Sequence, residues 1–599
     1  MSIEKLNLDA FPDVTNIQVQ VNTEAPGLAS EEVEQLITYP IEAVMYSLPD
    51  VEEVRSISKT GLSVISIVFK EGTDIYFARQ LVFEQLQAAR ENIPDGVGIP
   101  EMGINTSGLG MVFQYVLLAD ENSGVDAMQL RSLNDWVVKL LLLPIDGVTD
   151  VLSFGGEVRQ YQVQLNPARI LSYHLSPSDI SDAIAANNRN AGGWYINRGA
   201  EQLVLRAVGW IRSGDNGLVD LENIPVKEVD GVVVKVKDLA TVELGGEIRQ
   251  GAVTMSTRDE QGESFSRGEV LAGIVFKRKG ANTNATIEGV YDRLPLIEQA
   301  LPEGVKLQPY YDQADLIGKA INTISMALLQ AFVLIVIILL VFLMNIRATV
   351  LVLISIPLSI GLALTVMAYW GVSANLMSLG GLAIAIGIMV DGSVVMMENI
   401  FSNLTRQDAD HAHESASTEL QTQRTAGIRR RIQEAATEIA SPVFFAVMII
   451  VVVFAPLFTL EGVEGKLFQP MAISIVLAML ASLLVALIVI PALASFLFKR
   501  EPVYKESPVL RPIADFYRSL LNKAMVKRQL VVGLATGLFL VSLLVLTQLG
   551  TEFVPELEEG TLNIRTTLAP SSSLETSVNL APKLETIFCL LYTSPSPRD

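Results

Sequence analysis

The chain has 599 residues, 50% of them hydrophobic, and a formal net charge of −21 at pH 7. The acidic balance argues against a nucleic-acid partner and suits a domain that meets cations or basic partners. The only cysteine, Cys589, lies in the terminal segment 589–599, so the rest of the chain has no disulfide framework.

Residues 1–100 show the pattern of a small α/β module. The predicted elements are a strand at 14–21, a helix at 30–46, strands at 51–58 and 62–69, and a helix at 74–90. This β-α-β-β-α order is the split βαβ arrangement of ferredoxin-like modules, in which the helices cover one face of the sheet.

A second module of the same kind is predicted from two separated segments, 101–150 and 247–311. The run 143–151 echoes the run 48–54, which is consistent with an internal duplication. Between the two segments lie residues 151–246, and from about residue 192 this stretch changes to short alternating strands with glycine and charged turns. We interpret this stretch as an inserted subdomain.

The mean hydropathy is positive, and the apolar residues concentrate between about residues 316 and 549. Six apolar runs approach the roughly 20 residues that a helix needs to cross a bilayer. They lie at 326–344, 348–370, 376–400, 441–460, 471–498 and 530–549. Within the third run, Gly380, Gly381 and Gly387 are interpreted as positions of close helix packing.

Lysine and arginine gather in every second loop between these runs, which predicts that those loops are cytoplasmic. The membrane sector is then 312–500 with a cytoplasmic loop at 402–440, a cytoplasmic linker at 501–528 and a further span at 529–550. Within the loop, residues 424–440 predict an amphipathic helix on the inner leaflet. Residues 1–311 and 551–588 lie on the outer side in this topology.

Each end of the sequence carries a separate expectation. An outer domain of this size must be exported, but the first residues show no signal segment, so we expect a membrane helix upstream of Met1. Residues 589–599 resemble one reading frame of a sequencing-library adaptor, and we leave them out of the predicted fold.

One acid, Asp391, lies in the middle of the third apolar run. A carboxylate there costs about 3 kcal/mol on insertion scales, so the first hypothesis is a proton or ion relay, and the alternative is an Asp bonded only to neighbouring backbone. Glu398 lies seven residues further, close to the same helix face, and is either a second relay residue or an interfacial cap. No glycine-rich ATP loop occurs, so an ion gradient is the expected energy source.

Four stretches then support a resemblance to a known family. They are Phe11-Pro12-Asp13-Val14-Thr15, residues 375–381, Val390-Asp391-Gly392 with Glu398-Asn399, and residues 458–468. With them the chain resembles the resistance-nodulation-division exporters, in particular their heavy-metal branch. The resemblance implies an α+β membrane protein in which a transmembrane helix bundle carries periplasmic ferredoxin-like porter modules and an inserted docking subdomain. It also implies a proton antiporter, which is a secondary active transporter and not an enzyme.

The same resemblance implies partners and a location. It implies a homotrimer in a Gram-negative inner membrane, with a periplasmic membrane-fusion adaptor and an outer-membrane channel as partners. It implies that the chain holds the second to seventh membrane helices of the family pattern, and that 551–588 begins a second periplasmic half. It further implies that a lysine, on a helix outside this sequence, pairs with Asp391.

The resemblance also bears on the transported ion, and no cofactor besides that ion is expected. Drug-exporting relatives place two adjacent aspartates where this chain has Asp391 and Gly392, which favours a metal. Some divalent-metal exporters add an Asp where this chain has Ala385, which favours Cu(I) or Ag(I) over Zn, Co or Cd. Methionines form the ion path in that subgroup, and the matching positions are Met377, Met389, Met396 and Met479. Ile248 and Ala494 depart from the path, and core packing is the alternative role for the methionines.

Two other functions stay open at this point. One is an exporter of amphiphilic drugs, against which Gly392 argues, and the other is a non-transporting membrane scaffold, which needs no proton relay. An enzyme is least expected, because the outer sector has no Ser/His/Asp constellation and only His174 as a general base.

Overall fold

A computed structural model of the chain describes residues 12–94, 96–120, 123–229, 231–249, 251–258, 264–405, 418–498, 510–550, 563–569 and 571–591. Parts of the predicted loop 402–440, linker 501–528 and outer segment 551–588 lie outside the described residues, as do Phe11 and most of 589–599. The chain divides into two compact units. The first is drawn from 1–112, 277–288 and 312–565, and the second from 113–276, 289–311 and 566–599.

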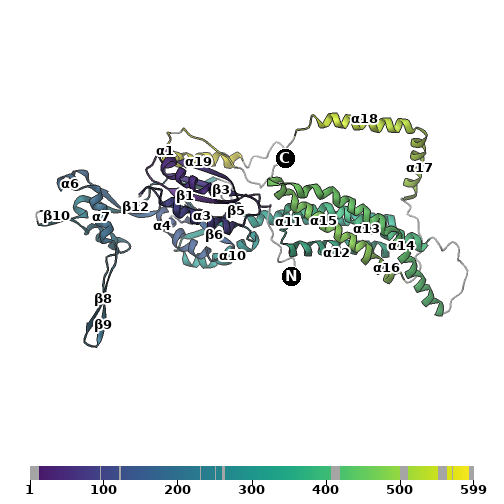
Figure 1. Cartoon of the computed structure of the whole chain (residues 1–599), viewed down its shortest axis with the longest axis horizontal. Coiled ribbons are helices and arrows are strands. Elements are labelled where there is room, and N and C mark those ends of the chain that lie inside the picture. Colours follow the sequence, from purple (N-terminus) through teal and green to yellow (C-terminus); the bar gives the residue numbers. More distant parts are fainter. Residues whose placement is uncertain are drawn as a thin grey trace. The chain divides into compact units, whose positions relative to one another are not determined.

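The first unit begins with a four-stranded antiparallel sheet in the order β2-β3-β1-β4 (Figure 1). Its strands are β1 (Ile17–Glu24), β2 (Val51–Lys59), β3 (Leu62–Phe69) and β4 (Pro100–Met102). Buried residues of β1 and β3, such as Val19, Ile65 and Ile67, share a core with the helix residues Ile37 and Leu86. The predicted β-α-β-β-α order of elements is confirmed here.

Strand β1 lies three residues later than its prediction, because it starts at Ile17 and not at Val14. A turn precedes it, in which the Asp13 carboxylate accepts a hydrogen bond from the Thr15 backbone N–H at 3.0 Å. Pairing with β3 therefore begins at Ile17, opposite Phe69.

Two helical segments pack on this sheet. One joins α1 (Ser30–Val33), a π-turn (Glu34–Thr38) and α2 (Tyr39–Met45), and the other is α3 (Ile75–Arg90) with Asp74 as its N-cap. The π-turn directly precedes the turn that contains Pro40, whose nitrogen has no hydrogen to donate. A second π-turn (Asn134–Val138) joins α4 (Ala127–Leu133) to α5 (Lys139–Leu142) ahead of β6 (Val148–Phe154). This recurrence agrees with the internal duplication that the sequence indicates.

The second unit is built on a sheet in which β13, β14, β5 and β15 follow one another and β6 also pairs with β14. Its further elements are β5 (Thr106–Ala119), β13 (Val253–Arg258), β14 (Ser264–Arg278), α10 (Thr283–Ala300) and β15 (Val305–Asp312). Helix α19 (Leu574–Leu591) lies against β13, where the Glu585 carboxylate accepts hydrogen bonds from the hydroxyls of Thr254 and Ser256. Strands from both predicted segments, 101–150 and 247–311, thus share one sheet.

The inserted stretch begins and ends with two paired strands, β7 (Arg159–Leu165) and β12 (Ala240–Gly246). Between them come α6 (Pro167–Ser172), α7 (Pro177–Asn187), β8 (Ala191–Arg198), β9 (Glu201–Ala207), α8 (Asp215–Glu222), β10 (Pro225–Val229), β11 (Val232–Lys235) and α9 (Val236–Leu239). The predicted short strands are present, but the sequence pattern missed α8 and α9, which are too short to show a helical period. Every residue of the hairpin β8–β9 is exposed, and the hairpin extends away from α7 in Figure 1.

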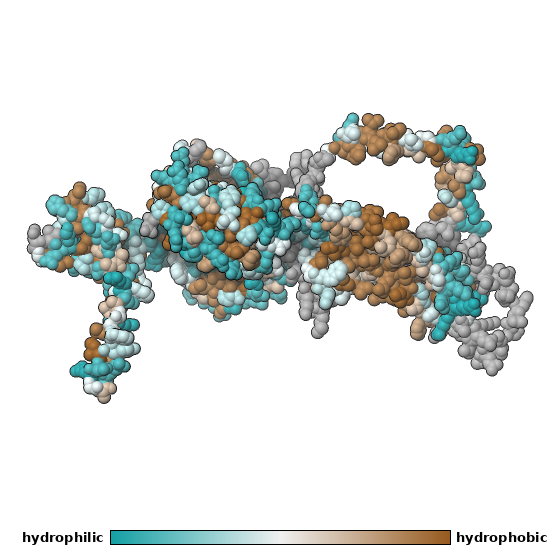
Figure 2. Space-filling model, viewed as in Figure 1, coloured by the Kyte–Doolittle hydropathy of each residue, from teal (hydrophilic) through white to brown (hydrophobic). Residues whose placement is uncertain are grey.

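Six described helices are long and apolar enough to cross a membrane, and each overlaps one of the six predicted runs. They are α11 (Gln313–Leu343), α12 (Ile346–Trp370), α13 (Leu376–Thr405), α14 (Thr418–Phe454) with a 3₁₀ turn (Ala455–Thr459), α15 (Gly462–Leu484) continued by a π-turn (Val485–Val489) and α16 (Ile490–Leu497), and α18 (Arg528–Leu546). Helix α17 (Leu510–Val526) precedes α18. Hydrophobic side chains cover the bundle α11–α16 in Figure 2, as expected for a surface in contact with lipid.

Two of these helices extend beyond their predicted spans. Helix α11 starts at Gln313, because the Asp312 carboxylate caps it by accepting a hydrogen bond from the Ala314 N–H at 2.7 Å. Helix α14 runs without a break from Thr418 through 424–440 into the span. The predicted helix at 424–440 is therefore confirmed as a helix, and it forms one continuous element with the span that follows. The helix accommodates Pro442 in its interior and does not end there.

Of the three glycines assigned to close packing, only Gly381 meets a neighbouring helix within the part of the chain that the structure describes. A Cβ atom at Gly381 would lie 2.8 Å from the Met471 carbonyl oxygen and closer still to the Ser474 hydroxyl, both on α15. A Cβ at Gly380 or Gly387 would meet nothing within 4 Å outside its own helix. The prediction is thus confirmed for Gly381, whereas for Gly380 and Gly387 it stays a prediction, because α15 packs on the side of α13 that carries Gly381.

We expect Gly381→Ala to lower the free energy of unfolding by about 1–3 kcal/mol, since the added methyl group forces α13 and α15 apart. Gly380→Ala is the matched control, and it should be neutral or stabilising by up to about 1 kcal/mol through helix propensity alone. Thermal unfolding of both variants in detergent measures the difference. Equal midpoints for the two variants would contradict the close contact.

Candidate functional site

Asp391 and Glu398 lie on one face of α13 that the described residues leave uncovered. The exposed residues of this face follow one another at intervals of three or four, as Ile384, Gly387, Asp391, Val395 and Glu398. Among the described residues, no hydrogen bond or ion pair reaches the Asp391 carboxylate. A bond from neighbouring backbone, the alternative role for this acid, is therefore not found in this part of the chain.

Ile384 and Val395 make the surroundings of Asp391 apolar, and a charged carboxylate in such surroundings costs several kcal/mol in a membrane. Two changes lower that free energy: a cation on a facing helix, or uptake of a proton. The face that α13 offers to its neighbours thus differs between the charged and the neutral acid.

A buried cap fixes the start of the helix that carries Asp391. The Asn375 side-chain oxygen accepts a hydrogen bond from the Ser378 N–H at 2.8 Å, and the Ser378 hydroxyl accepts one from the Asn375 N–H at 2.9 Å. Both residues are fully buried. At the other end, the Asn399 amide donates to the Ala435 carbonyl of α14 at 2.8 Å. The motif residues 375–381 and Glu398-Asn399 therefore include contacts that position α13.

The methionines that match the ion path lie mostly on the opposite side of α13 from Asp391. Met389, Met396 and Met479 belong to one buried apolar cluster between the helices, whereas Met377 is half-buried. The Ser482 hydroxyl of α15 donates to the Met389 carbonyl at 2.8 Å, and Met479 lies one turn away on α15. Three thioethers thus share the interior of the bundle, separate from the acidic stripe.

Ile248 and Ala494, the two positions at which the chain lacks a methionine of the path, differ in burial. Ala494 is buried in the same cluster, while Ile248 is exposed in the second unit. Among the described residues, no group of three or more His, Cys, Asp or Glu side chains is placed to hold a metal ion.

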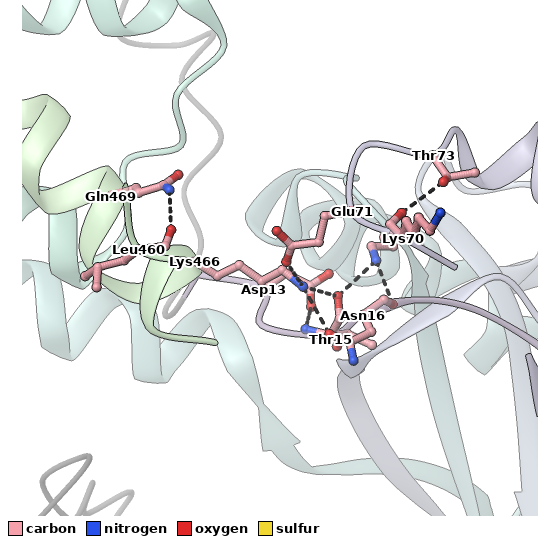
Figure 3. Close-up of polar contacts among 10 residues, drawn as sticks. Asp13, Thr15, Asn16, Lys70, Glu71, Thr73, Leu460, Lys466 and Gln469 are labelled. Atoms are coloured by element: carbon pink, nitrogen blue, oxygen red, sulfur yellow. Dashed lines mark hydrogen bonds and ion pairs between the residues drawn. The ribbon is translucent and has the colours of Figure 1, made fainter. Parts of the chain in front are cut away.

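A polar junction joins the first sheet to the start of α15, as Figure 3 shows. The Lys466 ammonium lies 3.1 Å from the Glu71 carboxylate, and it donates to the Asn16 side-chain oxygen at 3.2 Å. Lys279 donates to the backbone carbonyls of Thr15 and Asn16, each at 3.2 Å. The junction therefore brings together the sequence stretches 11–15 and 458–468, which lie far apart in the chain.

The sequence analysis assigned no role to Lys466, Lys279 or Glu71. One signal was present, because Lys466 is the only lysine or arginine in the loop 461–469 that was assigned to the outer side. No pattern pointed to Glu71 or Lys279, since their contacts with residues 13–16 and 466 depend on the tertiary fold.

A family model described as the AcrB/AcrD/AcrF family matches residues 1–591. The cobalt-zinc-cadmium resistance protein CzcA of Cupriavidus metallidurans is 38% identical over 591 residues, which cover 98% of this chain and 53% of that protein. The cation efflux system protein CusA of Escherichia coli is 34% identical over 580 residues, covering 96% of this chain and 53% of that protein. The solved structure described as a heavy metal efflux pump, crystal form I, aligns with a TM-score of 0.81 and 32% identity, over 98% of this chain and 54% of that one. The chain thus spans about half the length of these relatives.

We expect Asn375→Ala to lower the free energy of unfolding by about 1–2 kcal/mol, because it removes a buried N-cap and leaves the Ser378 N–H without its acceptor. Thr365→Val is the control, since the Thr365 hydroxyl is exposed and donates only to the Gly361 carbonyl of its own helix. Thermal unfolding in detergent is the measurement. A midpoint for Asn375→Ala equal to that of the control would show that the cap does not hold α13.

Proposed function

Because the chain belongs to the AcrB/AcrD/AcrF family of resistance-nodulation-division exporters, we propose that it takes part in the proton-driven efflux of heavy-metal cations across a Gram-negative inner membrane. The names of the relatives, which include cobalt-zinc-cadmium resistance and cation efflux, support a metal as the cargo. The observation that carries the proton coupling is the position of Asp391, on an uncovered and otherwise apolar face of a membrane-spanning helix. On this proposal, 1–100 and the pair 101–150 and 247–311 are porter modules, and 151–246 is a docking subdomain.

In the proposed cycle, Asp391 alternates between a charged and a neutral form. The deprotonated carboxylate pairs with a cation on a facing helix, which is a lysine in the family pattern, and protonation from the outer side releases that pair. Glu398, two turns further on the same face, passes the proton on toward the cytoplasm. A chain of contacts leads from α13 to the first sheet, through the Ser482 bond to Met389, then along α15 to Lys466 and Glu71. This contact path supports a coupling between proton transfer and movement of the porter modules.

An exporter of amphiphilic drugs is disfavoured by the surroundings of Gly392. A Cβ atom there would touch the Val443 side chain of α14 at 3.4 Å, so a second carboxylate at this position would meet an apolar neighbour. The acidic stripe of α13 consists of Asp391 and Glu398 alone.

We expect Asp391→Asn to abolish proton-coupled metal efflux, because the amide keeps the shape of the side chain but takes up no proton. Folding should be retained, since the side chain touches no described partner. The measurement is metal-dependent proton flux in proteoliposomes, with Glu461→Gln as a control outside the spanning stripe. Unchanged flux in Asp391→Asn would rule out the relay, whereas absence of flux in the parent chain itself would favour a non-transporting scaffold.

For the ion, we propose Cu(I) or Ag(I) over Zn, Co or Cd, and the proposal rests on the methionines. Thioether sulfur suits soft monovalent ions and offers little to Zn(II). Met389, Met396 and Met479 place three such groups in the bundle interior, and Met377 is the fourth candidate of the path. Sequence identity does not support this choice, because the relative named for cobalt, zinc and cadmium is 38% identical to the chain and CusA is 34% identical.

We expect Met389→Leu to lower Ag(I) efflux at least about tenfold, because leucine conserves the volume of the side chain but removes the sulfur ligand. Met397→Leu is the matched control, since Met397 is equally buried on the same helix but does not belong to the proposed path. Radiotracer efflux of Ag(I) and of Zn(II) from vesicles distinguishes the ions. Equal losses in both variants would assign Met389 to packing.

The proposal includes a homotrimer, a periplasmic membrane-fusion adaptor and an outer-membrane channel as partners. The hairpin β8–β9 supports the homotrimer, because an isolated two-stranded hairpin with both faces exposed is marginally stable in water. Its Trp194 side chain is 86% exposed. A second copy of the chain that covers this hairpin would bury such side chains.

A further inference from the structure

Helix α17, which directly precedes α18, has an apolar side and a polar side. The large apolar side chains recur at intervals of three and one and therefore share one side of the helix: Ile513, Phe516, Tyr517, Leu520 and Leu521. The other side carries Arg511, Asp515, Arg518, Ser519 and Asn522. We propose that α17 lies on the surface of the membrane, with its apolar side against the acyl chains and its basic residues on anionic lipid headgroups. This inference does not depend on the transported ion or on the proton relay.

The apolar side of α17 is uncovered in the part of the chain that the structure describes. Apart from Ala514 and Ala524, every residue from Arg511 to Val526 is exposed, and the Phe516 side chain is 70% exposed. A helix of 17 residues is marginally stable in water by itself, because most helices in proteins are stabilised by the packing of an apolar face. The exposed apolar side therefore indicates a contact with a further apolar surface.

Basic residues flank the apolar side of α17. With about 3.6 residues per turn, Arg518 falls at the edge of the apolar side that ends with Leu521. Lys523 falls at the opposite edge, two turns after Phe516. Their long aliphatic stems can lie along an apolar surface while the charged groups stay in the polar layer. This distribution is typical of a helix that lies in the interface plane of a membrane.

The charge of this segment favours an anionic surface. Residues 511–528 contain five basic residues and one acid. That acid, Asp515, lies 3.9 Å from Arg518 in a solvent-exposed pair, which compensates little of the charge. Among the described residues, no ion pair reaches Arg511, Lys523, Lys527 or Arg528. A bilayer with anionic headgroups matches both the positive charge and the apolar side of α17.

The start of α18 places the end of α17 at the boundary of the bilayer. One residue, Lys527, separates the two helices, and its backbone is not helical, so the chain bends there (Figure 1). The 19 residues of α18 form a helix about 28 Å long, which is close to the roughly 30 Å thickness of the hydrocarbon core. Arg528, the first residue of α18, then lies at one boundary of that core, which is the inner leaflet in the predicted topology. The neighbouring end of α17 is therefore held beside the headgroups.

The test uses the whole chain in nanodiscs of phosphatidylglycerol and phosphatidylcholine in equal parts, with Cys589→Ser to remove the only cysteine. Spin labels are attached to Leu520→Cys on the apolar side and, as the matched control, to Ser519→Cys on the polar side. Collisions of each label with oxygen, which concentrates among acyl chains, and with a water-soluble nickel chelate are measured by electron paramagnetic resonance.

We expect the label at position 520 to be reached by oxygen and protected from nickel, and the label at position 519 to be reached by nickel. Protection of position 520 from both reagents would show that protein covers the apolar side. Access of nickel to both positions would show that α17 lies in water. Either of these results overturns the proposal.

Lys523→Gln, with the label kept at position 520, tests the contribution of the anionic headgroups. We expect it to lower the ratio of nickel-protected to nickel-accessible label by about fivefold, the effect of one basic residue near an anionic surface. Nanodiscs of phosphatidylcholine alone should lower the ratio at least as much. Lys319→Gln is the control, because it removes the same charge from α11, where Lys319 is exposed and pairs with Asp315 at 2.7 Å, and the ratio should not change. A ratio that responds neither to Lys523→Gln nor to the lipid charge, or that responds equally to both lysine variants, overturns the assignment to anionic lipid.

Discussion

The close packing of α13 against α15 is the contact on which the rest of the membrane sector depends. Gly381 allows the backbone of α15 to approach, and the Ser482 hydroxyl closes the contact by donating to the Met389 carbonyl. In lipid, where the hydrophobic effect gives no preference for helix over acyl chain, small residues and interhelical hydrogen bonds supply much of the attraction between helices. This contact decides which side of α13 is buried and therefore which side remains for Asp391.

The orientation of α13 about its own axis places two kinds of side chain on different sides of the helix. One side holds buried thioethers among apolar neighbours, and the other presents two carboxylates at helical spacing. A proton that binds Asp391 changes the charge on the uncovered side of α13 and does not contact the methionines. In the proposed exporter, protons and metal ions would therefore follow different sides of the same helix, and rigid movement of α13 would link them.

The junction at Lys466 connects α15 to the first sheet. Helix α15 carries both the Ser482 contact and Lys466, and Lys466 reaches Glu71 and Asn16 beside the first sheet. The side chains there are charged and partly buried, so their energies respond to any displacement of the start of α15.

Local patterns in the sequence determined most of the secondary structure and the leading candidate site residue. Hydropathy located the six apolar helices, alternation and caps located the strands and helices of residues 17–90, and Asp391 stood out because its cost in lipid does not depend on knowledge of the fold. Short-range patterns failed where the deciding contact is distant. The turn at Asp13 delayed β1, and α14 continued through Pro442. Only the tertiary structure decided which face of α13 is covered, and only it brought Lys466, Lys279 and Glu71 together at one junction. The reason is physical: hydrogen bonding and periodicity act within a few residues, whereas burial and charge compensation depend on segments that pack together from far apart in the chain.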